Sequence, residues 1–149
     1  MREILFKAKR TDSDTWIEGN LLTFDSRRYI INDIETIYYC PQCDREETRE
    51  VWFAVIPETV SQFTGLYDKN GVRIFENDIV IIGGNKSFPT MIEFLSGSWQ
   101  CVRKYTDKGR ENEYSYLHRL EYDNPNQYEI IGNIHDNADL LGENNAKEQ

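Results

Sequence analysis

The segment from Gln62 to Val80 constrains the fold more than any other part of this 149-residue chain. It alternates runs of β-forming residues with turn formers, and Asn70-Gly71 lies between two such runs. Asn-Gly is a strong short-range signal for a β-hairpin, because both residues adopt positive φ at low cost. The apolar run over 78–82 then predicts a buried strand. The segment therefore predicts a compact β unit.

Further β-prone runs recur at intervals of about 8–12 residues, a spacing typical of a sandwich or a barrel. Gly19 is expected to be a bulge or a close approach to neighbouring backbone. An aromatic content of 13% also favours a β-rich core over a helical bundle. Besides the hairpin, strands are predicted over 4–8, 16–18, 20–24, 29–31, 35–39, 50–56, 90–94, 99–102, 117–120 and 128–134.

The predicted fold is mainly β with little helix. Residues 62–135 are expected to form a small SH3-like barrel, and 1–56 an additional β layer packed on it. We expect one domain over 1–141, with subregions 1–56 and 57–141, and a disordered tail over 142–149, which lacks an apolar anchor. Long apolar strand edges are expected to become contacts between copies of the chain. The predicted core is Phe63, Leu66, Ile74, Ile79, Ile81, Ile92, Phe94, Trp99 and Ile131.

Two blocks of the sequence resemble the YopX family of phage and prophage proteins. The first is the Gln62-Phe63-Thr64-Gly65-Leu66 segment with the Asp68-Lys69-Asn70-Gly71 turn and Glu76-Asn77-Asp78-Ile79-Val80. The second runs from Tyr128 to Leu141, and the start of the chain is also similar. Asn77 stands where the family usually has Gly, which suits a left-handed backbone position that both residues tolerate. The resemblance implies a YopX-like fold and phage provenance, but no reaction.

Charge and composition narrow the classes of partner and compartment. The net charge of −9 opposes tight binding to a phosphate backbone, which relies on basic residues that release counterions. No apolar run reaches the roughly 18 residues that a membrane span needs, and no signal peptide is apparent. Three cysteines, an odd number, fit a reducing compartment. We expect a protein of the bacterial host's cytoplasm that contacts no membrane.

Cys40-Pro41-Gln42-Cys43 is the sharpest chemical candidate, because a turn with this spacing can direct two thiolates at one zinc ion. The sequence has no second motif of this kind. Cys101, His118, Asp44, His135 or a second subunit would have to complete the site. Two free cysteines in an exposed turn are the alternative. No other cofactor is expected.

Basic and aromatic residues gather over 99–119, which makes this segment the favoured partner-binding surface. Interleaved Arg, Lys and Tyr on a β-barrel can stack and neutralise single-stranded nucleic acid. The intervening Glu111 and Glu113 and the overall charge oppose that use. The alternative is a solvated hairpin whose tyrosines cover the core. The candidate partner-binding residues are Trp99, Arg103, Lys104, Tyr105 and Arg119.

The remaining polar candidates favour structural roles. Glu76 and Asp78 can bind a cation or raise a pKa, but Asp and Asn at a tight corner more often bond to the backbone. His118 and His135 lie near no nucleophile in a catalytic context. We therefore expect no enzyme.

The leading hypothesis is a phage- or prophage-encoded accessory protein, a self-associating binding module with a host or phage protein as a possible further partner. The alternative is a nucleic-acid-binding regulator that uses the barrel and residues 103–119.

Overall fold

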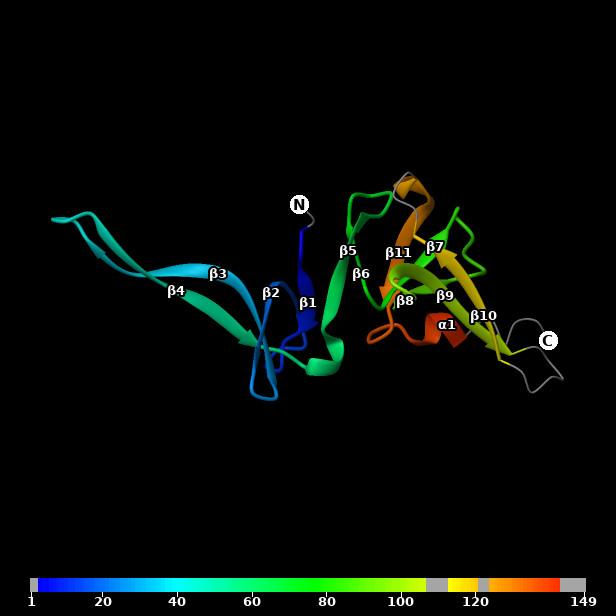
Figure 1. The fold of residues 1–149 in the computed structure, drawn as a ribbon, viewed down its shortest axis with the longest axis horizontal. Helices are drawn as coiled ribbons and strands as arrows, with labels where there is room; N and C mark the ends of the chain where they lie inside the picture. Colours follow the sequence, from blue (N-terminus) through cyan, green and yellow to red (C-terminus); the bar gives the residue numbers. More distant parts are fainter. Residues whose placement is uncertain (1–2, 107–112, 121–123, 143–149) are drawn as a thin grey trace. The chain divides into compact units, whose positions relative to one another are not determined.

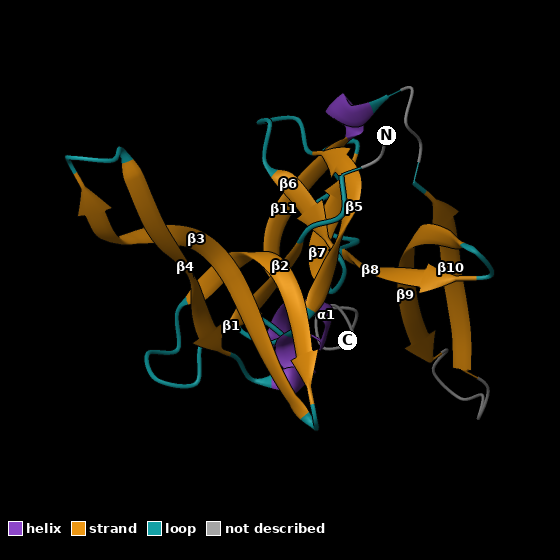
Figure 2. Cartoon of the chain, turned by 60° about the vertical axis from the view of Figure 1, so that its left-hand side comes forward, coloured by secondary structure: helices purple, strands orange, loops and turns teal. Residues whose placement is uncertain are grey.

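The structure is a computed structural model that describes residues 3–106, 113–120 and 124–142, with side chains for all of these except 33–40, 46, 104–106, 113–117 and 125. The described chain divides into two compact units, unit 1 up to Gln62 and unit 2 from Phe63 onward. Strands dominate both units, and helix is limited to short segments (Figure 2). A mainly β fold with little helix is thus confirmed. The single domain over 1–141 stays a prediction, and 143–149 of the predicted tail lie outside the described residues.

Unit 1 is an antiparallel sheet that contains β1 (Phe6–Lys9), β2 (Trp16–Phe24), β3 (Arg27–Cys40) and β4 (Arg45–Ala54). β1 pairs with β2 on one side and with Ser61 and Gln62 of β5 (Ser61–Tyr67) on the other. A 3-10 turn at Pro57–Thr59 connects β4 to β5. The runs 16–18 and 20–24, predicted as two strands, form one strand, β2. The runs 29–31 and 35–39 likewise form one strand, because a bulge between Ile31 and Asp33 absorbs the polar interruption.

One face of the unit 1 sheet supplies a small apolar core. Ala8, Ile30 and Val55 are buried there. Phe6, Ile17, Leu21 and Val60 are partly buried against them. The members on β1, β2 and β3 share a face because directly opposed residues of an antiparallel pair point to the same side. Val55 and Val60 flank the 3-10 turn that follows β4.

Unit 2 contains a short hairpin and a five-stranded antiparallel sheet (Figure 1). The hairpin joins the end of β5 to β6 (Arg73–Phe75). Among the described residues the sheet has the order β10-β9-β8-β7-β11, with β10 and β11 as its terminal strands, so the SH3-like barrel stays a prediction. A short helix, α1 (Asp139–Gly142), follows β11. The strands are β7 (Asp78–Ile82), β8 (Thr90–Leu95), β9 (Ser98–Thr106), β10 (Glu113–Arg119) and β11 (Tyr128–Asn133), the last preceded by a 3-10 turn at Pro125–Gln127.

Seven of the nine predicted core residues are buried, and the other two are not. Ile131 is 36% exposed because a bulge between Ile130 and Gly132 takes it out of register with β7. Phe94 is 52% exposed beside the β8–β9 turn, where its ring packs edge-on against Trp99 with 5.0 Å between centroids. The core prediction was wrong at both positions. The local features responsible are a bulge and a hairpin end.

The hairpin predicted at Asn70-Gly71 is confirmed, but its loop is wider than a two-residue turn. Gly71 adopts a positive φ of 78°, whereas Asn70 does not. Asp68 Oδ1 instead accepts hydrogen bonds from the backbone N–H groups of Asn70, at 2.8 Å, and Val72, at 3.0 Å. A two-residue turn with consecutive positive φ values, at Ser96 and Gly97, instead connects β8 to β9.

Candidate functional site

The most extended feature of unit 1 is the hairpin of β3 and β4, which continues past the rest of the sheet (Figure 1). β2 pairs with β3 only from Arg27 to Ile31. β4 pairs with β3 along its whole length, from Tyr29 opposite Ala54 to Cys40 opposite Arg45. Beyond Ile31, the described pairings of this hairpin are therefore those of a two-stranded ribbon. We call residues 32–51 the arm.

Exposed aromatic residues lie on the unit 1 sheet, and one of them, Trp52, adjoins the arm. Phe24 at the end of β2 is 70% exposed, and Trp52 on β4 is 52% exposed. The Trp52 ring lies 6.1 Å from that of Tyr29, and its Nε1 donates a hydrogen bond to Glu50 Oε2 at 3.0 Å. Large apolar side chains near an open strand edge are typical of contact surfaces.

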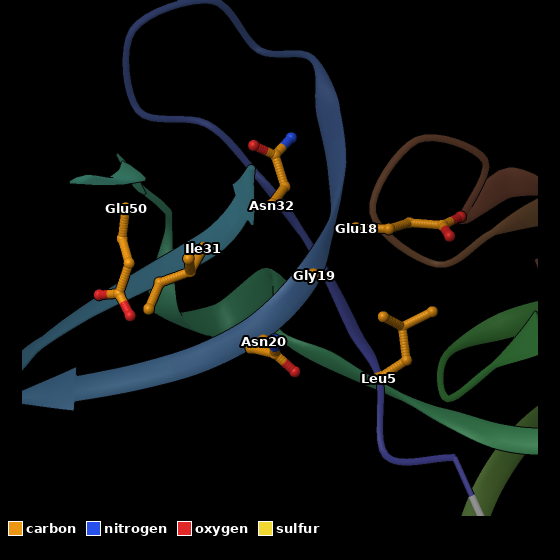
Figure 3. A pocket seen from close by; sticks show the side chains of 7 residues that line it. All are labelled: Leu5, Glu18, Gly19, Asn20, Ile31, Asn32 and Glu50. Carbon is orange, nitrogen blue, oxygen red and sulfur yellow. The ribbon is translucent and has the colours of Figure 1, made fainter. Parts of the chain in front are cut away.

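A shallow hollow of about 590 Å³ lies where β2 and β3 diverge (Figure 3). Gly19 lets the two strands approach closely just before they diverge, because a Cβ at this position would lie 2.2 Å from the carbonyl oxygen of Ile31. The close approach predicted at Gly19 is confirmed. At the next residue of β3 the bulge turns the strand away from β2. The lining is Leu5, Glu18, Gly19, Asn20, Ile31, Asn32 and Glu50.

The predicted zinc ligands Cys40 and Cys43 lie at and beside the tip of the arm. Cys43 is a free, exposed cysteine, and the side chain of Cys40 lies outside the description. Across the residues that the structure describes, no group of three or more His, Cys, Asp and Glu could hold a metal ion. Cys101 lies in unit 2, where burial raises the pKa of its thiol to about 12 and so disfavours the thiolate that zinc requires. Zinc at Cys40 and Cys43 stays a prediction.

The predicted partner-binding residues are not presented together on a surface. Trp99 and Arg103 are both buried in unit 2. The Arg103 guanidinium donates from Nη1 to the Pro89 carbonyl at 3.1 Å and lies 4.5 Å from the centre of the Phe88 ring. Both residues therefore contribute to packing in unit 2.

Of the other residues in that group, Arg119 is exposed at the end of β10, where its backbone pairs with Gln100. Lys104 and Tyr105 lie on β9, with side chains outside the description.

The carboxylate and histidine candidates occupy structural positions in unit 2. Buried Asp78 accepts a hydrogen bond at Oδ2 from the backbone N–H of Phe75 at 2.8 Å, as predicted for a residue that holds the corner. Glu76 is half-buried in the preceding turn. His118 Nε2 lies 3.4 Å from the hydroxyl of buried Tyr128, and His135 is half-buried after β11.

The arm was not predicted as one long hairpin, because the polar pair Asn32-Asp33 was interpreted as a break between two strands. The usable signal was the length of the β-compatible run on both sides of the Cys40–Asp44 turn. Alternating charges at Arg45, Glu47 and Arg49 also indicate an exposed strand.

No helix among the described residues combines the length and the apolar character of a membrane span. Fold and site together define an antiparallel β protein of two compact units with a projecting two-stranded arm. The chain belongs to the YopX protein family, which it matches over residues 5–142.

Its fold is similar to that of protein EF1440 from Enterococcus faecalis, known from a crystal structure. The similarity has a TM-score of 0.50 at 24% sequence identity and covers 95% of this chain and 99% of that chain. No curated protein matches the sequence.

Proposed function

We propose that this protein is a phage- or prophage-encoded accessory protein that acts in the host cytoplasm as a self-associating, non-enzymatic binding module. The observation that carries self-association is the arm, in which β3 and β4 pair beyond the reach of β2. An isolated two-stranded ribbon is at best marginally stable in water, so a further strand or surface is expected to cover it. Phage provenance rests on membership of the YopX family.

A binding role is also supported by how the polar groups of unit 2 are used. Asp68 and Asp78 are buried and accept hydrogen bonds from backbone N–H groups. Carboxylates engaged in this way hold loops in place and are poorly suited to proton transfer. The exposed features of unit 1, in contrast, are strand edges and aromatic rings, which suit protein contacts.

Size-exclusion chromatography with multi-angle light scattering tests self-association directly. We expect the full chain at micromolar concentration to elute with the mass of a dimer or a larger assembly. A monomer across that range would contradict the proposal.

A tagged pull-down from infected host cells, divided into nuclease-treated and untreated halves, tests which partner is bound. Retention of a host or phage protein after nuclease treatment would support a protein-directed role. Loss of the bound material on nuclease treatment would instead favour the nucleic-acid-binding alternative.

A further inference from the structure

We propose that Asn70 is a site of spontaneous deamidation, that the folded β5–β6 loop holds it in an unreactive conformation, and that the isoaspartate product cannot rebuild this loop. The inference concerns a chemical modification of unit 2 and is independent of the proposed self-association. Asn70-Gly71 is the only Asn-Gly pair in the sequence, and both residues are exposed. Water can therefore reach the reacting atoms, and ammonia can leave.

The reaction is an intramolecular acyl transfer. The backbone nitrogen of Gly71 attacks Cγ of Asn70, so that an N–Cγ bond forms and the Cγ–Nδ2 bond breaks. Nδ2 leaves as ammonia and takes the proton that the Gly71 nitrogen gives up. Water then opens the five-membered imide at one of its two carbonyl carbons, which gives aspartate or isoaspartate. Glycine favours the attack, because it has no Cβ beside the nucleophilic nitrogen.

The folded loop keeps Asn70 away from the geometry that this attack needs. The Gly71 N–H donates to the Asp68 carbonyl at 3.0 Å, and neither Lys69 nor Asn70 has a positive φ. These are the features of a type I turn, in which Asn70 is the third residue and has a ψ of about 0°. Ring closure requires the Gly71 nitrogen to eclipse Cβ of Asn70. Because the substituents of Cα are tetrahedral, this requires a rotation of roughly 120° in ψ.

Further hydrogen bonds oppose that rotation. Asp68 Oδ1 accepts from the backbone N–H groups of Asn70 at 2.8 Å and of Val72 at 3.0 Å. The Asp68 N–H donates to the Val72 carbonyl at 2.8 Å. The Gly71 nitrogen, the nucleophile, is itself engaged as a donor to Asp68. Asn70 therefore reacts only from a state in which the loop has opened, and the small population of that state slows the reaction.

Isoaspartate at this position is incompatible with the same contacts. Its main chain runs through Cβ, which adds one carbon atom between the N–H of residue 70 and that of Val72. Both of these donors now reach one oxygen of Asp68, and the longer chain moves them apart. The released α-carboxylate also adds a negative charge close to the buried Asp68 carboxylate. Deamidation therefore marks, irreversibly, those chains whose loop has opened.

Peptide mapping of the full chain by mass spectrometry tests the site and its protection. The protein is incubated at mildly alkaline pH in buffer and in guanidinium chloride, and is then digested under mildly acidic conditions, in which the imide forms slowly. In denaturant we expect Asn70 to deamidate before any other asparagine. In buffer it should react at least about tenfold more slowly, because the loop must first open. Equal rates in the two conditions, or another asparagine that reacts first in denaturant, would overturn the proposal.

Two variants separate opening of the loop from a general loss of stability. Asp68→Asn weakens the hydrogen bonds of the loop and should raise the rate at Asn70 in buffer roughly fivefold. Gly19→Ala is the matched control, because it disturbs unit 1 and leaves the loop unchanged. Circular dichroism confirms that both variants are folded. If both variants accelerate the reaction equally, or if neither does, the loop does not control the reaction.

Refolding after the reaction tests the effect of the product. Chains converted in denaturant are returned to buffer, and the isoaspartate and unmodified fractions are compared by urea denaturation. The isoaspartate fraction should have the lower urea midpoint. Asn70→Ser cannot form the imide, so this variant passes through the same treatment as the control and should keep its midpoint. An isoaspartate fraction as stable as the unmodified fraction would show that the loop tolerates the longer chain, and would overturn that part of the proposal.

Discussion

Asp68 Oδ2 accepts a hydrogen bond from the backbone N–H of Ile130, with 3.3 Å between the two atoms. The other oxygen of the same buried carboxylate accepts from Asn70 and Val72 in the hairpin loop. One side chain thus joins the two blocks that carry the family resemblance, which lie about 60 residues apart in sequence. Asp68 is therefore a structural centre of unit 2.

Replacing Asp68 by Ala should lower the free energy of unfolding by about 3 kcal/mol, because buried backbone donors lose their acceptor. Asp68→Asn keeps one side-chain oxygen and should lie between Ala and the wild type. Urea denaturation followed by tryptophan fluorescence measures both. Equal stability of Asp68→Ala and the wild type would show that water replaces the carboxylate at no cost.

Asn77 has a φ of +66°, and its backbone N–H donates to the Ile92 carbonyl at 2.8 Å. Asn77→Ala should destabilise the protein by about 1 kcal/mol, because Cβ disfavours the left-handed conformation and Ala lacks the local hydrogen bonding of Asn. Asn77→Gly should stay within about 0.5 kcal/mol of the wild type. Thermal unfolding of the three proteins side by side gives the ranking, and an Ala variant as stable as Gly would contradict it.

Gly19→Ala is expected to destabilise unit 1 by about 3 kcal/mol, since the new methyl group would overlap the Ile31 carbonyl and β2 would have to move. Gly142→Ala is the matched control, because a Cβ there meets nothing within 4 Å. Hydrogen exchange localises the effect. Gly19→Ala should speed exchange in β2 and β3 and leave β7 and β8 unchanged. If the backbone amides of β2 and β3 were protected equally in Gly19→Ala and Gly142→Ala, the two strands would accommodate the new methyl group without loss of stability.

Cys101 should resist alkylation in the folded protein, because burial raises the pKa of its thiol from 9.0 to about 12. In a Cys40→Ser variant, native labelling with a maleimide dye should modify one thiol, that of exposed Cys43, and labelling in denaturant should modify two. Mass spectrometry reads the stoichiometry. Two labels on the native protein would show that β9 opens readily.

The same thiol makes stability depend on pH. The folded-state pKa lies above the ordinary value, so the stabilising contribution of the neutral thiol is complete below pH 9.0 and is lost as pH rises toward about 12. Cys101→Ser replaces the thiol by a hydroxyl group that does not titrate between pH 9.0 and about 12. Urea midpoints measured from pH 8 upward should therefore fall less steeply for Cys101→Ser than for the wild type.

Several features could be predicted from the sequence because the signals are local. Alternation and turn residues indicated the mainly β fold, the β5–β6 hairpin and the β7 strand. The left-handed position of Asn77 and the close approach at Gly19 followed from what those residue types tolerate. The family was apparent from two short motifs, and it is confirmed over residues 5–142.

Other features depended on contacts between strands far apart in sequence. The exposure of Ile131 and Phe94 follows from a bulge against β7 and from the end of the β8–β9 hairpin. Burial of Arg103, which was expected on a binding surface, and of Trp99, which was predicted both for the core and for that surface, reflects the pairing of β9 with strands on both sides. The arm exists because β2 stops pairing with β3 at Ile31. Side-chain type and spacing set which residues can form a strand, whereas the pairing partners of each strand decide which of its faces and edges are left open.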